Sequence, residues 1–144
     1  MSLKIINSSN SEWLDYYERL NEKQRDVFYH PGFAKTCQNT LYRSHQIKCA
    51  VWDCNQGTIL YPFVLRQFLK SSYNDITGLY GRGGIAQDIN DTNQIKAFHS
   101  AFREYCLKVG VVCSFDRFNP VLENHLFADN LVKLNNVGEF VVLD

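Results

Sequence analysis

A cluster of glycines directly after a strand-like segment places the strongest local constraint on how this chain can fold. Four glycines fall within seven residues of the stretch 73–86, at Gly78, Gly81, Gly83 and Gly84. Glycine adopts positive φ and has no Cβ, so backbone N–H groups in such a stretch can converge on an anion or a carbonyl oxygen. The spacing matches neither G-x-x-x-x-G-K-[ST] nor a clean G-x-G-x-x-G. Taken alone, the pattern favours a flexible strand-to-helix connection, with a ligand-binding loop as the alternative.

Length and charge narrow the class of protein. The 144 residues, 45% hydrophobic and 14% aromatic, suit a single domain with one filled core. Lys plus Arg and Asp plus Glu both number 15, and a formal charge of zero argues against a duplex nucleic acid as the partner. No apolar run approaches the roughly 20 residues that span a bilayer, and residues 1–10 lack the apolar core of a signal peptide. We therefore expect a soluble cytoplasmic protein.

The five cysteines include no C-x-x-C pair and are odd in number, which disfavours a disulfide framework or a zinc site. Cys49, Cys106 and Cys113 lie in apolar segments and are expected to be small core residues, whereas Cys54 lies in a turn and is expected to be exposed. Neither a bound metal nor a permanently bound cofactor is expected.

Hydrophobic periodicity predicts an α/β (α+β) fold with a mixed, largely antiparallel sheet flanked by helices. Strands are expected at residues 3–7, 47–53, 58–67, 73–80 and 111–118 and near the end of the chain at 139–144. Helices are expected at residues 9–20, 31–40, 91–109 and 121–128. Two capping pairs support these starts, Ser9 with Glu12 and Asp91 with Gln94.

Several strands carry more specific expectations. The nearly continuous apolar run 59–65 indicates a strand covered on both faces, although Pro62 should mark an edge position or a bulge. The apolar strand 111–118 is expected to be internal. Folded chains seldom end on a strong core strand such as 139–144, so we expect this chain to be the N-terminal portion of a longer protein.

Three segments, taken in order, resemble a known family. They are Phe-Tyr-His-Pro-Gly-Phe-Ala-Lys at 28–35, Tyr-Gly-Arg-Gly-Gly at 80–84 and Arg-Phe-Asn-Pro at 117–120. Their order and spacing resemble those of the FemA/FemX-like (FemAB) acyltransferases. These are bacterial peptidoglycan-bridge aminoacyltransferases, with relatives in surface-polysaccharide clusters, built on the GNAT-superfamily acyltransferase fold. The resemblance spans nearly the whole chain and implies a single GNAT-like domain over residues 1–144, incomplete at its C-terminus.

The resemblance implies transfer of an acyl or aminoacyl group to an amine of a cell-envelope precursor, either peptidoglycan or surface polysaccharide. The donor would be an aminoacyl-tRNA or an acyl-CoA, and the acceptor a small-molecule or lipid-linked precursor, with proximity to a membrane surface in the lipid-linked case. The attacking amine must lose a proton and the tetrahedral oxyanion needs donors, so a base or relay group and convergent N–H groups are expected. The region that supplies most donor contacts in the family lies beyond this chain, so we expect the 144 residues alone to be inactive.

The resemblance marks candidate substrate-binding residues and leaves the catalytic residue unassigned. Lys35 matches a family lysine that faces the acceptor's phosphates, and Arg82 could bind a phosphate or carboxylate in bidentate fashion. The alternative for each is a solvated surface cation. The full candidate set is Lys35, Tyr80, Gly81, Arg82, Gly83, Gly84, Arg117 and Asn119.

Two of these candidates have competing structural interpretations. Some relatives carry an acid at the position of Asn119, and an amide can only orient by hydrogen bonds. Arg117 follows Asp116 in an apolar strand, so the two should face opposite sides, and whichever faces the interior needs a partner. A structural role for Arg117 at the strand end is the more economical interpretation. His30 and Tyr29 could serve a relay and an acceptor cleft, with capping and core filling as their alternatives.

Two other function classes stay open at the level of sequence. The chain could be a non-catalytic module that binds a partner protein, or forms a homodimer, through an open C-terminal strand. It could instead be a stand-alone GNAT acyl-CoA N-acyltransferase, which the lack of room for a complete donor site after Asp144 disfavours.

Overall fold

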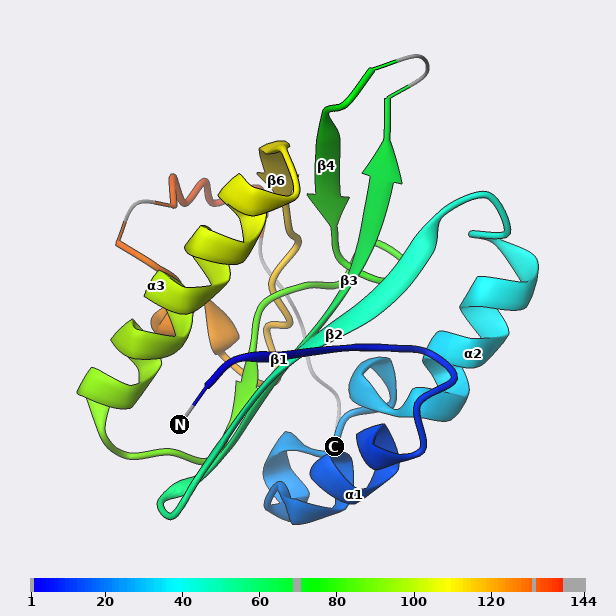
Figure 1. Ribbon diagram of the computed structural model, residues 1–144. Coiled ribbons are helices and arrows are strands. Elements are labelled where there is room, and N and C mark those ends of the chain that lie inside the picture. Colours follow the sequence, from blue (N-terminus) through cyan, green and yellow to red (C-terminus); the bar gives the residue numbers. More distant parts are fainter. Residues whose placement is uncertain (1, 69–70, 131, 139–144) are drawn as a thin grey trace.

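The computed structural model describes residues 2–68, 71–130 and 132–138, and these form a mixed α/β structure with an open, mostly antiparallel sheet (Figure 1). The three α-helices are α1 (Glu12–Arg19), α2 (Pro31–Thr40) and α3 (Thr92–Lys108). The six strands are β1 (Lys4–Asn7), β2 (Gln46–Cys54), β3 (Gly57–Gln67), β4 (Asn74–Thr77), β5 (Ala86–Gln87) and β6 (Val111–Phe115). Short 3₁₀ turns lie at η1 (Glu22–Gln24), η2 (Val27–Tyr29) and η3 (Asn124–Phe127). This order confirms the predicted fold class.

The sheet has the strand order β1-β2-β3-β4-β6, and β5 pairs with β3 beside β4. All neighbours are antiparallel except β4 and β6, which run parallel because α3 lies in the connection between them. β2 and β3 form a hairpin whose turn is closed by the pair Cys54 and Gly57. Pro62 lies in β3 between the residues that pair with β4 and those that pair with β5, so its missing N–H falls at a break in the pairing.

Helices cover both faces of the central strands, α1 and α2 on one side and α3 on the other (Figure 1). Side chains of β2 alternate accordingly: Ile47, Cys49 and Val51 join the cluster under α1 and α2, while Ala50 and Trp52 join the cluster under α3. The predicted double coverage of β3 is confirmed, since Leu60 and Val64 face the first cluster and Ile59, Tyr61, Phe63 and Leu65 the second. The predicted stripe of α3 also packs there, namely Ile95, Phe98, Phe102, Cys106 and Val109.

The helix starts show which local signals were correct. α2 has the predicted bounds because Pro31 occupies its first turn and His30 caps it, its Nδ1 accepting from the Gly32 N–H at 3.0 Å. At α3, the Asp91 carboxylate accepts from the N–H of Asn93 at 2.8 Å, and Gly110 (φ +71°) follows the last turn. The bounds of the helix agree with the prediction, but the predicted pairing of Asp91 with Gln94 is wrong, because Gln94 Oε1 accepts from Trp52 Nε1 at 3.0 Å.

The predicted capping box of α1 is wrong. The helix begins at Glu12, its N-cap Ser11 makes no side-chain cap hydrogen bond, and the Glu12 N–H bonds to Asn10 Oδ1 at 2.8 Å. Ser9 belongs to the preceding turn, where its N–H bonds to Asn7 Oδ1 at 3.0 Å. The side chains of Asn7 and Asn10 thus accept from the two N–H groups that a Ser9–Glu12 capping box would have used.

The prediction that strand 111–118 is internal is also wrong. β6 ends at Phe115 and forms an edge of the described sheet, and its residues from Val112 onward are exposed. Exposure reaches 59% at Val112 and 64% at Phe115, and Cys113, expected in the core, is exposed as well. The apolar composition was real, but it does not reveal whether another strand covers the segment.

Two further expectations concern the C-terminal strand and membrane-spanning helices. The expected strand 139–144 lies outside them. Within the described ranges, no helix is both long and apolar enough to cross a membrane.

Candidate functional site

The glycine loop, residues 78–84, folds back on itself in a conformation that requires its glycines. Gly81 and Gly84 have φ angles of +74° and +86°, and Tyr80 shares this left-handed region at +51°. A Cβ on Gly78 would lie 1.9 Å from the carbonyl oxygen of Arg82, so the two ends of the loop touch backbone to backbone. The loop is therefore a tightly closed turn, and the expectation of a merely flexible connection does not describe it.

Buried side chains from distant parts of the chain hold this loop. The hydroxyl of Tyr29, in η2, donates to the Gly84 carbonyl at 3.1 Å. Asn124, which is fully buried, donates through Nδ2 to the Tyr29 hydroxyl at 2.8 Å and to the Gly83 carbonyl at 3.0 Å. Burial raises the pKa of Tyr29, so this phenol remains a hydrogen-bond donor.

Asn119 completes the connection between the three segments. Its backbone N–H donates to Asn124 Oδ1 at 2.8 Å, and its Nδ2 donates to Asp26 Oδ2 at 2.9 Å. Its Oδ1 accepts from the Val121 N–H at 3.0 Å. With both side-chain groups engaged inside the fold, Asn119 serves to orient structure. We call the set Tyr29, Gly83, Gly84, Asn119 and Asn124 the loop junction.

The end of β6 meets the loop through the backbone. Gly83 donates its N–H to the Arg117 carbonyl at 2.9 Å, and Gly83 and Phe118 form a parallel bridge. The Arg117 side chain is exposed, so this residue contributes to the strand end through its main chain. The Arg82 guanidinium lies 5.7 Å from the centroid of the Phe28 ring, a cation–π contact that joins the first and second segments.

Asp116 lies beneath the loop and was not among the predicted site residues. Its Oδ2 accepts from the Tyr61 hydroxyl at 2.5 Å. Burial raises the pKa of the Asp116 carboxyl, and the bonds from Tyr61, then Gly84 and Gly78, act against that rise. The expectation that one of the pair 116–117 faces the interior with a partner is met by Asp116 with Tyr61. An acid within an apolar strand was the signal that could have identified it.

Two predicted binding residues lie apart from the junction. Lys35 is exposed on α2, and no described hydrogen bond or ion pair links it to the glycine loop. Tyr80 is 65% exposed at the tip of the loop, where its backbone N–H donates to the Tyr42 hydroxyl at 3.2 Å. The structure thus gathers Gly81, Arg82, Gly83, Gly84, Asn119 and the main chain of Arg117, with Tyr80 at the rim and Lys35 outside.

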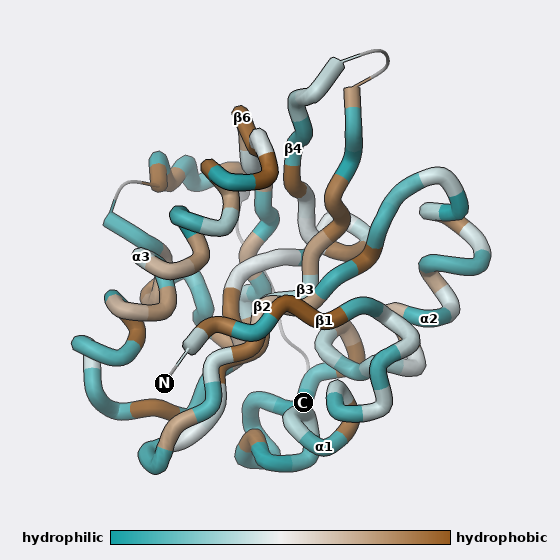
Figure 2. Tube along the Cα trace, in the orientation of Figure 1, coloured by the Kyte–Doolittle hydropathy of each residue, from teal (hydrophilic) through white to brown (hydrophobic). Residues whose placement is uncertain are grey.

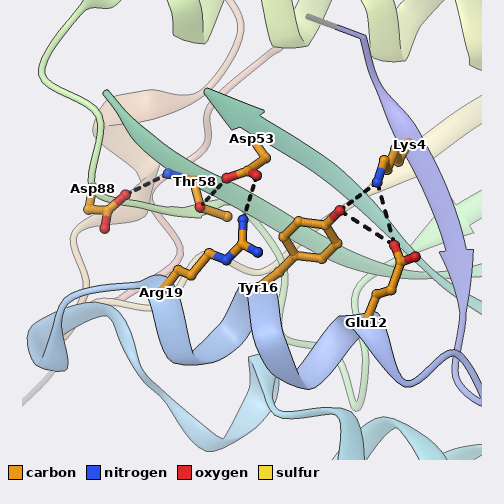
Figure 3. Close-up of polar contacts among 7 residues, drawn as sticks. All are labelled: Lys4, Glu12, Tyr16, Arg19, Asp53, Thr58 and Asp88. Atoms are coloured by element: carbon orange, nitrogen blue, oxygen red, sulfur yellow. Dashed lines mark hydrogen bonds and ion pairs between the residues drawn. The ribbon is translucent and has the colours of Figure 1, made fainter. Parts of the chain in front are cut away.

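A second polar cluster lies on the α1 side and links α1 to neighbouring strands (Figure 3). Lys4 donates to the Tyr16 hydroxyl at 2.7 Å, which joins β1 to α1. Arg19 pairs with Asp53 at 2.6 Å, and Asp53 also accepts from the Thr58 hydroxyl at 2.9 Å. The Arg19–Asp53 contact ties α1 to the β2–β3 hairpin, and it is an exposed ion pair of the kind that contributes little to stability.

Within the described ranges, no three His, Cys, Asp or Glu side chains are grouped so that they could hold a metal ion. Shallow hollows occur between β1 and α3, around Ile5 and Tyr105, and beside Asn90, both lined by residues outside the glycine loop. Comparison with known proteins gives no significant match to a family model, a curated protein or a solved structure. The function must therefore be inferred from the residues and their geometry.

Proposed function

We propose that this chain is the N-terminal, acceptor-binding part of a cytoplasmic FemAB-like acyl- or aminoacyltransferase that modifies an amine of a cell-envelope precursor. The observation that carries the proposal is the loop junction. The three segments that resemble the family are far apart in sequence, yet buried hydrogen bonds bring them together at one glycine loop. Core packing alone would not require these segments to meet through polar groups.

The rim of the glycine loop has the chemistry for a phosphate-bearing acceptor. The Gly83–Phe118 bridge joins the segment that contains Arg82 to the segment that contains Arg117. Guanidinium groups suit the diphosphate of a nucleotide-linked or lipid-linked precursor. The exposed ring of Tyr80 borders the same loop.

The chemical step would take place in the longer protein. The acceptor amine attacks the carbonyl carbon of the acyl donor, the bond to the tRNA or CoA leaving group breaks, and the amine loses one proton. Asn119 cannot accept that proton, since its amide is already bonded to Asp26 and Val121. We therefore assign to this chain the binding and orientation of the acceptor, and leave the base to the region that follows.

The proposal is tested by measuring binding of UDP-N-acetylmuramoyl pentapeptide, a nucleotide-linked envelope precursor, by titration calorimetry. We expect Arg82→Ala and Arg117→Ala each to raise the Kd about tenfold, as loss of a charge-assisted hydrogen bond would. Lys35→Ala tests the remaining predicted contact, and Lys96→Ala, an exposed lysine on α3, is the matched control. Equal affinity in the Arg82, Arg117 and Lys96 variants would remove the site assignment.

A second candidate function is a non-catalytic interaction module, and the exposed edge of β6 favours it. Among the described residues, β6 pairs only with β4, and its exposed residues include Val112 and Phe115. Unpaired strand edges with apolar side chains are templates for pairing with another chain. This candidate predicts a dimer of the chain by light scattering at micromolar concentration. A monomer at every concentration measured would eliminate it.

A further inference from the structure

The carboxyl group of Asp116 is packed directly against the glycine loop. A Cβ on Gly83 would lie 2.0 Å from Asp116 Oδ1 and 2.3 Å from its Cγ, so the loop backbone has approached the carboxyl as far as a glycine permits. On its other side the carboxyl is held by the Tyr61 hydroxyl, at 2.5 Å from Oδ2. Tyr61 is itself buried in β3, the central strand of the sheet. The carboxyl therefore connects the rigid sheet to the loop.

The second oxygen of this carboxyl has an unusual environment. Oδ1 is buried and has no hydrogen-bond partner of ordinary geometry within the described structure. Leaving such an atom unpaired costs about 1–3 kcal/mol, so its placement calls for an explanation. The N–H groups of Gly78 and Gly84, at the two ends of the loop, favour the ionised form of Asp116.

We propose that Asp116 is the positioning residue of the glycine loop, because its carboxyl group is held by Tyr61 on one side and packs against Gly83 on the other, and so fixes the loop against the sheet. Only the consequence for acceptor binding rests on the function proposed above. The titratable groups around the carboxyl are Tyr61 from β3 and Tyr29 from η2, with Asp26 and Cys106 acting on these tyrosines. Burial raises the pKa of both tyrosines, so both phenols stay protonated in acidic and neutral solution.

The test uses the full chain and follows backbone amides by NMR. In the wild type, the Gly78 and Gly84 amide shifts should titrate together with the Asp116 carboxyl, and this titration should vanish in Asp116→Asn. Hydrogen exchange of the loop amides should become about tenfold faster in Asp116→Asn, while amides of β2 stay unchanged. Tyr61→Phe, which keeps the carboxyl and removes one hydrogen bond, should give a smaller increase in the same direction. Asp53→Asn, which alters a hydrogen-bonded carboxylate at the hairpin, should leave the loop as in the wild type.

The outcomes separate this inference from the proposed function. Unchanged loop exchange in Asp116→Asn, or Gly78 and Gly84 shifts that titrate equally in both proteins, would overturn the positioning role. Faster exchange in the variant would support it even if the wild-type chain fails to bind UDP-N-acetylmuramoyl pentapeptide. That binding failure would count against the proposed function alone.

Discussion

The loop junction and strand β6 meet where the chain leaves β6, but the junction buries polar groups whereas β6 exposes apolar ones. At the junction, Asn124 is fully buried and its side chain makes three hydrogen bonds, to Tyr29, Gly83 and Asn119. In β6, the residues from Val112 to Phe115 are exposed, and one edge of the strand pairs with no described segment. Figure 2 shows that the labelled end of β6 is hydrophobic.

This difference indicates which part of the fold is complete within the described residues. The junction is satisfied internally, so its geometry should survive whatever this chain binds. The edge of β6 leaves apolar side chains in contact with water, which is unfavourable in free energy. Covering these side chains would remove that unfavourable contact. A rigid site next to an open edge is consistent with either function proposed above.

The largest expected effect comes from filling the space between the loop and Asp116. Gly83→Ala would place a methyl group 2.0 Å from Asp116 Oδ1, and overpacking of this kind should lower the free energy of unfolding by about 3 kcal/mol. The measurement is urea denaturation. Gly138→Ala is the control because its Cβ would meet no atom within 4 Å, and it should leave the midpoint unchanged. A loss at Gly83 no greater than at Gly138 would show that the loop does not pack on the carboxyl.

A somewhat smaller effect should follow from removing the buried amide of the junction. Asn124→Ala leaves the Asn119 N–H and the Gly83 carbonyl without their partner, which should cost about 2 kcal/mol in the free energy of unfolding. Asn90→Ala, at an exposed loop position, provides the control. If thermal unfolding shows the same stability for both variants, the junction is not a hydrogen-bonded unit.

The pH dependence of stability gives a smaller effect with a defined sign. Burial raises the pKa of Asp116 in the folded chain above its unfolded value of about 3.9, so folding favours the protonated carboxyl. Its contribution is complete below that unfolded pKa and is lost as the pH rises through the folded pKa. The stability of the wild type relative to Asp116→Asn should therefore fall as the pH rises above about 4.

Asp15→Asn controls for loss of one exposed charge on α1. Its difference from the wild type should lack the trend seen for Asp116→Asn. Stability of the wild type that rises relative to Asp116→Asn over the same pH range would mean that the carboxyl is held ionised by its donors and that burial does not dominate.

The smallest effect is expected at the exposed edge. Phe115→Ser removes a side chain that is 64% exposed, so the free energy of unfolding should change by no more than about 0.5 kcal/mol. Unfolding should be measured at a low and a high protein concentration. A loss above 1 kcal/mol that appears only at high concentration would show that a second copy covers β6, and the comparison between a closed junction and an open edge would then apply to the monomer only.

Local signals in the sequence were enough for much of the fold. Pro31 and His30 set the start of α2, and the stripe from Ile95 to Val109 identified α3 and the face that it buries. These predictions succeed because a helix start and the periodic spacing of apolar residues both depend on residues that are close together in the sequence. The expected capping box at Ser9 failed because nearby asparagines competed for the same N–H groups.

The site was less accessible to sequence reasoning, because its contacts join residues far apart along the chain. The roles of Asn124 and Asp26 depend on partners 41 and 93 residues away, and no short motif marks either residue. The exposure of β6 likewise depends on whether a neighbouring strand covers it, and the apolar composition of the strand cannot predict this. No pattern in the sequence shows which side chains join the three segments.

Amide hydrogen exchange of the loop junction is the most direct test of the central claim that three distant segments form one buried unit. The Gly83 N–H bonds to the Arg117 carbonyl and the Asn119 N–H bonds to Asn124 Oδ1, so both should exchange only with global unfolding. The Gly138 N–H is exposed and makes a local hydrogen bond to Asn136 Oδ1 at 3.1 Å, so it should exchange far faster than the amides of the junction. If Gly83 and Asn119 exchange as fast as Gly138, the segments do not meet as described and the acceptor-site proposal loses its basis.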